Sequence, residues 1–315
     1  MITALTTFQQ WLLFSGTTVV VGCVAWRVLV MPRALKVLAA ENATTITRIE
    51  QRVASLGLIS TGVLFVAWTL RLVVQVMGFR DPFVPLRDDV SFLLFEIFWG
   101  SVWIAQGAVL TLLAVALWLA GRKSRSTSEA AQPEAPVVLS AGWAVAMPLV
   151  VTLAATLAMS GHAMGVDSAR TLAVTVDATH TLAAGVWMGT LAVILTVGRV
   201  RGENSPAIFA SQIRSFSPLA LVSGITLVAM GAGLAWKHLH AVSDLWTLTY
   251  GRLLSAKVAL ALVIFGLGFL NWRRGLPLCD TEQGAEVVGR RGVWEVSLAA
   301  VVILVTAVLV HSAKP

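Results

Sequence analysis

Eight long apolar segments constrain the fold of this 315-residue chain more than any other feature. A helix needs about 20 largely apolar residues to cross a bilayer, and its backbone must satisfy its own hydrogen bonds there. Only 12% of the residues are charged, against roughly 25% in a soluble domain. The sequence therefore predicts an all-α polytopic membrane protein. The eight transmembrane helices are expected at residues 8–30, 54–77, 92–120, 138–160, 172–197, 217–236, 250–271 and 293–312.

The positions of Lys and Arg predict how the chain is oriented. Fifteen of the 23 basic residues fall in the first, third, fifth and seventh loops. Because basic residues accumulate in cytoplasmic loops, we expect both termini to be extracytoplasmic. The same short loops account for the net charge of +7 without a basic soluble face. The lipid bilayer is therefore an expected partner, and a nucleic-acid partner is not expected.

A weak internal repeat relates the two halves of the chain. A shift of 151 residues places Trp99-Gly100 on Tyr250-Gly251 and Arg122-Lys123 on Arg273-Arg274. Because four spans make an even number, the two halves are predicted to be parallel and related by an axis along the membrane normal. The expected organisation is one membrane domain without a soluble domain, divided into four-helix halves at residues 1–160 and 161–315.

The segment from Met159 to Gly189 concentrates groups that can bind a metal. Imidazole and thioether together suit copper as Cu⁺ or Cu²⁺. The predicted ligands are His162, His180, Met159, Met164 and Met188. Two structural interpretations remain open at this stage. Each histidine could donate a hydrogen bond to a neighbouring helix, and methionine commonly fills gaps in an apolar core.

Further polar residues could complete or serve such a site. His311 falls within one residue of His162 under the repeat and is a predicted third ligand between helices 4, 5 and 8. Asp177 is predicted to accept a hydrogen bond from a ligand imidazole and so to fix its tautomer. Charges inside spans are costly and usually paired, so Lys257 is expected to pair with a carboxylate such as Glu96 or to act as a gate. Glu295 is expected to pair with an inner-loop arginine or to help release a cation.

Two other histidines and two cysteines carry weaker expectations. His238 and His240 fall in the sixth loop, where an interfacial role is favoured over metal transfer. Cys23 and Cys279 lie far apart, which predicts neither a disulfide nor a zinc site. Gly185 and Gly189 form a GxxxG motif that permits close helix contact.

Three segments resemble the copper resistance protein D family. They are Gly161-His162-Ala163 with Asp177-Ala-Thr-His180 and Trp187-Met-Gly189, then Tyr250-Gly-Arg-Leu-Leu-Ser-Ala-Lys257, and then Arg290-Arg-Gly-Val-Trp-Glu295. The resemblance is best over about residues 160–312. It implies a multi-pass protein of the bacterial inner membrane that handles copper, commonly with a periplasmic CopC-like partner. It also places the family's histidines at His162 and His180.

The predicted function is copper transport or handling rather than an enzymatic reaction. Copper would arrive at the outer histidines and methionines between the halves and move inward. The alternative is a b-type haem protein for electron transfer, because paired imidazoles in a helical bundle also bind haem. His180 with His162 or His311 could form such a pair.

Overall fold

The computed structural model confirms eight helices that are long and apolar enough to cross a membrane. It describes residues 2–35, 43–129, 139–160, 170–198, 205–238, 241 and 243–312. All described elements are helical. The candidate spans are Thr3–Ala34, Thr45–Phe79, Phe98–Arg122, Ala141–Met159, Arg170–Thr196, Pro206–Gly233, Thr249–Leu278 and Glu282–Leu309.

Several spans combine an α-helix with a short π-helical or 3₁₀ turn. The first and fifth spans each contain a π-helical turn within otherwise regular helix. The elements are α1 (Ile2–Ala25), η1 (Trp26–Val30), α2 (Met31–Ala34), α3 (Ala43–Phe79), α4 (Leu86–Ser91), η3 (Phe92–Glu96), α5 (Phe98–Glu129), α6 (Ala141–Met159), α7 (Arg170–Ala184), η5 (Gly185–Gly189), α8 (Thr190–Thr196), α9 (Ser205–His238), α10 (Asp244–Thr247), α11 (Thr249–Leu270), η6 (Asn271–Gly275), η7 (Leu276–Leu278) and α12 (Glu282–Leu309).

Every predicted span overlaps one of these helices, but several boundaries were predicted wrongly. Helices α3, α9 and α12 begin about eleven residues before the apolar run begins, and α5 continues to Glu129. The third loop was expected to be a flexible connector from residue 122, and its first part is helix instead. The extensions are polar, and a helix needs apolar residues only where it crosses hydrocarbon.

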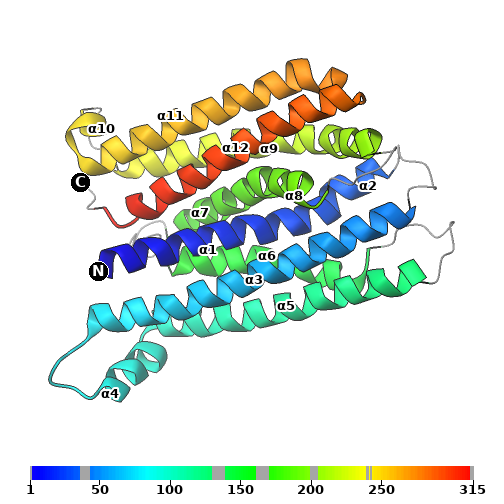
Figure 1. Ribbon diagram of the computed structural model, residues 1–315. Helices are drawn as coiled ribbons and strands as arrows, with labels where there is room; N and C mark the ends of the chain where they lie inside the picture. Colours follow the sequence, from blue (N-terminus) through cyan, green and yellow to red (C-terminus); the bar gives the residue numbers. More distant parts are fainter. Residues whose placement is uncertain are drawn as a thin grey trace.

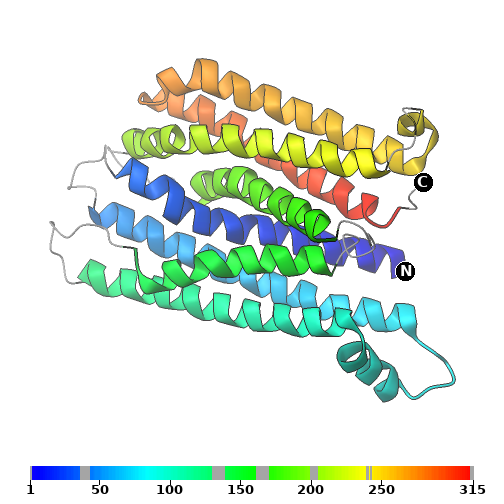
Figure 2. The ribbon, with the colours of Figure 1, turned by 180° about the vertical axis from the view of Figure 1, so that it is seen from behind.

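Helix α1 lies at the centre of the bundle, although it is the first in the chain (Figure 1). It packs against α3 on one side and against η5, α8 and α12 on the other. Two thirds (67%) of its most apolar stretch is buried, against 6% for the span that contains α11. Both termini lie at the same end of the bundle (Figure 2), as eight spans require. The extracytoplasmic location of that end remains a prediction.

Glycines set the distance between α1 and the fifth span. A methyl group on Gly22 would overlap the backbone of Gly189, and one on Gly189 would overlap the carbonyl of Thr18. Gly185, one turn earlier, rests on the side chain of Val21. The GxxxG prediction is thereby confirmed, since only glycine lets two backbones approach so closely.

Ile97 and Leu248, two positions that the predicted repeat pairs, lie in the same kind of local turn. Ile97 and Leu248, which are 151 residues apart, are extended residues that separate a short helical segment from the following span. Three residues later, Gly100 and Gly251 face the carbonyls of Leu93 and Asp244 respectively, so neither has room for a side chain. This likeness is local, and the arrangement of the whole chain as two parallel repeats remains a prediction.

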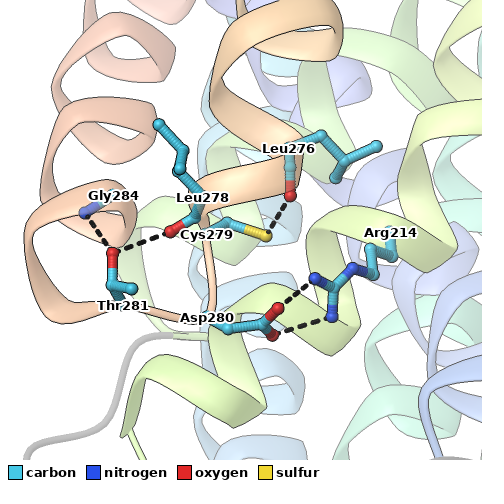
Figure 3. Close-up of polar contacts among 7 residues, drawn as sticks. All are labelled: Arg214, Leu276, Leu278, Cys279, Asp280, Thr281 and Gly284. Atoms are coloured by element: carbon cyan, nitrogen blue, oxygen red, sulfur yellow. Dashed lines mark hydrogen bonds and ion pairs between the residues drawn. The ribbon is translucent and has the colours of Figure 1, made fainter.

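At the other end of the bundle, an ordered turn connects α11 to α12 (Figure 3). The main-chain N–H of Gly284 donates to Thr281 Oγ1 at 3.1 Å, and the Thr281 hydroxyl donates to the Leu278 carbonyl at 2.9 Å. Arg214 of α9 donates two hydrogen bonds to the carboxylate of Asp280, one of them at 2.8 Å to Oδ1. The pair fastens this turn to α9, and the hydrogen bonds lower the pKa of Asp280.

We expect Gly22→Ala to destabilise the protein strongly. The added methyl group cannot be accommodated without moving α1 away from the fifth span, which should cost about 2 kcal/mol or more. Thermal unfolding in detergent measures the change. Gly62→Ala is the matched control, because the space around Gly62 is open and alanine favours a helix. Equal unfolding temperatures for both variants would contradict the close crossing.

The Arg214–Asp280 pair should stabilise the turn between α11 and α12 in a pH-dependent way. Folding lowers the pKa of Asp280. The stabilisation that the ion pair gives the folded protein is therefore fully present above the usual carboxyl pKa of about 3.9. It is lost as the pH falls through the lower folded value. The difference in unfolding temperature between wild type and Asp280→Asn should therefore be largest near neutrality and shrink in acid. Glu286→Gln, at an exposed carboxylate on α12, should show no such pattern.

Candidate functional site

His180 lies well inside the membrane span formed by α7, η5 and α8. It is ten residues from the start of α7 at Arg170, or about 15 Å along the axis. Its imidazole is hydrogen-bonded to the main chain of Leu227 on α9. The other ring nitrogen, Nδ1, is buried and has no partner in the described part of the chain. The bond to Leu227 therefore involves Nε2 and leaves the Nδ1 lone pair available.

Helix α9 presents a glycine, Gly231, to this ring. The space that the glycine leaves is small, because one added carbon would already be in contact with the imidazole. A side chain at Gly231 would place its first carbon 3.5 Å from His180 Cε1 and 3.9 Å from Nδ1. The expectation that this histidine bonds a neighbouring helix is confirmed for one nitrogen only. A buried nitrogen acceptor that is left unpaired costs free energy, so Nδ1 is a candidate atom for binding a ligand.

One charged side chain acts on His180 directly, and a second acts on the first. Lys257, on α11, is close enough to act on His180, and Asp177, one turn before His180 on α7, acts in turn on Lys257. The expected carboxylate near Lys257 is therefore Asp177 rather than Glu96. Glu96 ends the short segment η3 before α5 and is exposed. Nothing in the sequence indicated that Asp177 acts on Lys257, because α7 and α11 lie far apart in the chain.

Three of the other predicted ligands are described, and they lie at different places along their helices. Met188 lies eight residues further along, about 12 Å by helical rise, and is packed in the core. Met159 ends α6 and is half-buried, whereas His311 follows the end of α12 and is exposed. Partial burial of the His311 ring lowers its pKa. Among the described residues, no three His, Cys, Asp or Glu side chains form a metal-binding group.

Several predicted residues lie outside the part of the chain that can be described. His162 and Met164 belong to residues 161–169, between α6 and α7. His240 is also outside, as is the side chain of His238. The assignment of these residues to a metal site therefore remains a prediction.

A half-buried arginine of α3 that reaches the end of α6 was not identified from the sequence. Arg71 of α3 donates to the hydroxyl and to the carbonyl of Ser160, each at 2.8 Å. Gln106 of α5 donates to the same hydroxyl at 3.0 Å. The cluster holds the residue from which the chain leads to His162. The available signal was the single basic residue within the second apolar run.

A cavity of about 1000 Å³ lies deeper in the second half of the chain. It is bounded by α9, α11 and α12 and by Trp187 of η5. Glu295 of α12 accepts a hydrogen bond from Asn271 Nδ2 at 2.6 Å, and both residues line the cavity. The predicted pairing of Glu295 with an inner-loop arginine is therefore replaced by a neutral partner.

An aromatic contact bounds the cavity on the side of η5. The rings of Trp187 and Phe265 lie with their centroids 4.6 Å apart. Trp187 follows His180 by seven residues, about 10 Å along the span. Apolar rings therefore bound the Glu295 cavity on the side toward the region of His180.

Cys279 is the described thiol in the turn between α11 and α12. Its side chain is fully buried and donates to the Leu276 carbonyl at 3.0 Å, and burial raises the pKa of the thiol. A thiol that remains protonated is a poor metal ligand.

Known proteins are similar to this chain in sequence. Residues 210–310 match the family model described as copper resistance protein D. The chain is also 26% identical over 240 residues to the copper transport protein CutJ of Bacillus subtilis strain 168. That alignment covers 75% of this chain and 40% of the relative, so the chain spans about two fifths of the relative's length. No solved structure matches significantly.

The family match begins later in the chain than the sequence resemblance suggested. It covers α11 and α12 and almost all of α9, with Leu227, Gly231, Lys257 and Glu295, but it excludes the segment around His180. The chain is a multi-pass membrane protein whose residues 210–310 are similar to the copper resistance protein D family.

Proposed function

We propose that this protein handles copper in the membrane and moves it between the two sides, with His180 as a copper ligand. The observation that carries the proposal is the half-buried imidazole whose buried Nδ1 has no partner among the described residues, while its orientation is set by Leu227. Ligating histidines are characteristically oriented through their other ring nitrogen in this way. The family of residues 210–310 and the name of the B. subtilis relative support copper as the ion.

His180 would bind copper together with ligands from the connection between α6 and α7. His162 and Met164 lie on that connection, and Met159 lies just before it. The Arg71–Ser160 bonds hold its starting point against α3. Nitrogen and thioether ligands bind both common oxidation states of copper, with sulfur favouring Cu⁺. Met188, about 12 Å further in, would serve a later position on the route.

Asp177 and Lys257 would set the electrostatic cost of a cation at His180. A carboxylate one turn from the imidazole favours a positive ion, and a buried ammonium opposes one. We propose that Lys257 limits occupancy of the site and so promotes onward movement of the ion. Beyond His180, the ion would pass the Trp187–Phe265 contact. A membrane potential that is negative inside would favour inward movement of the ion by about 2.3 kcal/mol per charge for each 100 mV.

The remaining parts of this proposal concern the cell and its partners. We propose an inner-membrane location, a periplasmic CopC-like donor at the end that carries both termini, and a non-enzymatic role. A b-type haem between His180 and another histidine is the alternative function. The two are separated by whether the purified protein carries copper or shows a haem Soret band.

His180→Ala should remove copper from the purified protein. Wild type in detergent, loaded with Cu⁺ under reducing conditions and desalted, should retain about one equivalent by elemental analysis. The variant should retain much less, because alanine supplies no donor at this position. Retention by the variant equal to that of wild type would refute the assignment, and a Soret band would favour haem.

Gly231→Val is the matched test of access to Nδ1. Valine places methyl groups against Cε1 and Nδ1 without changing any proposed ligand, so copper retention should fall while His180 remains. Gly233→Val is the control on the same helix, since nothing lies within 4 Å of a side chain there. Loss of copper in both variants would indicate damage to α9 rather than a blocked ligand.

Changes of charge near His180 should shift copper affinity in opposite directions. Lys257→Gln removes the opposing charge and should tighten binding by about tenfold, equivalent to about 1.4 kcal/mol. Asp177→Asn should weaken it by a similar factor. Competition against a chelator of known affinity measures both. Changes in the same direction would rule out the electrostatic role.

A further inference from the structure

The cavity in the second half has the size and lining of a site for an organic molecule. Its volume of about 1000 Å³ is at the upper end of the range for drug-sized ligands, about 300–1,000 Å³. Its walls are mainly apolar and include the aromatic rings of Trp187, Phe265, Phe269 and Trp272. Small-molecule sites characteristically combine such walls with a few polar groups.

The polar group in this cavity is a carboxyl that lacks a cationic partner. Glu295 is 3% exposed, and its printed hydrogen bond comes from the neutral amide of Asn271. Within the described residues, no Lys or Arg forms an ion pair with it. Arg214 also lines the cavity but binds Asp280 instead. The buried carboxyl of Glu50 differs, because Arg27 donates to it at 2.8 Å.

A second polar atom beside Glu295 also lacks a partner. Asn271 Oδ1 is buried and accepts no hydrogen bond within the described structure. A buried carboxylate without a counter-ion costs several kcal/mol in a membrane protein. One positive charge placed between these oxygens and the aromatic rings would offset that cost, because cations are also attracted to the faces of tryptophan and phenylalanine.

The cavity is reached from the lipid-facing surface between α9 and α11. Leu221, Phe269 and Trp272 line it and are also 65%, 55% and 56% exposed. In the first half, the corresponding pair α3 and α5 is closed. There Trp68 and Trp103 stack at 3.9 Å, and each indole N–H donates to the carbonyl of the other residue. The opening thus belongs to the second half, and a molecule dissolved in the bilayer can enter it.

We propose that this cavity binds a lipophilic organic cation, a molecule with one quaternary ammonium or phosphonium charge on an aromatic or alkyl body. A single positive charge neutralises Glu295, whereas a divalent ion would leave a net charge in a low-dielectric site. Two oxygen atoms in so large a space do not enclose a bare metal ion, and the aromatic walls require an apolar body. This site is separate from His180 and does not depend on copper binding there.

Binding of radiolabelled tetraphenylphosphonium to the purified full chain in a neutral maltoside detergent tests the proposal. Wild type should show saturable binding to one site. Glu295→Gln should weaken it at least tenfold, because the positive charge loses its counter-charge while the amide oxygen still accepts the bond from Asn271. Neutral triphenylphosphine oxide should compete poorly. Absence of saturable binding, or equal binding by Glu295→Gln, would overturn the proposal.

Two further variants keep this test distinct from effects on folding and from the copper proposal. Leu221→Trp places a larger side chain at the lipid-facing opening without changing the carboxyl, and should reduce binding of the probe. His180→Ala should bind the probe as wild type does, whatever it does to copper. Equal loss of the probe in His180→Ala would mean that the two sites are not separate and would also refute the proposal.

Discussion

The contact between Gly22 of α1 and Gly189 of η5 determines how the rest of the bundle is arranged. Two backbones meet there without an intervening side chain, which draws the first and fifth spans together along the centre of the molecule. Each of these spans carries a π-helical turn close to the crossing. Because α1 occupies the centre, α7 is held with one face toward α9, and that face carries His180.

The two halves of the chain use similar helices for different purposes. In the first half, tryptophan stacking and the hydrogen bonds of Arg71, Gln106 and Ser160 join α3, α5 and α6 into a closed unit. In the second half, α9 and α11 are separated by a cavity, and α11 is the least buried span. The groups available for binding in the described structure, His180 and Glu295, both belong to this open half.

These two groups differ in chemistry as well as in depth. His180 offers a nitrogen lone pair in a confined space beside Gly231. Glu295 offers negative charge in a wide aromatic cavity, and Trp187 and Phe265 bound that cavity on the side nearer His180. A confined nitrogen donor suits a metal ion, whereas a wide apolar cavity with one charge suits a larger organic molecule. The arrangement therefore favours two sites with different ligands.

By itself, the sequence determined the number and approximate positions of the spans, because a membrane segment must be long, apolar and helical wherever it lies in the fold. It also identified the glycine motif, since local spacing places both glycines on one helix, whereas the role of His180 as a ligand remains a prediction. The pairings of Lys257 and Glu295, the central position of α1 and the opening between α9 and α11 were decided only by the tertiary structure. Those features depend on which helices become neighbours, and in a bilayer apolar faces pack almost equally well against lipid and against each other. Small differences, such as a glycine at a crossing or a stacked pair of indoles, therefore select the neighbours, and a hydropathy pattern does not contain that information.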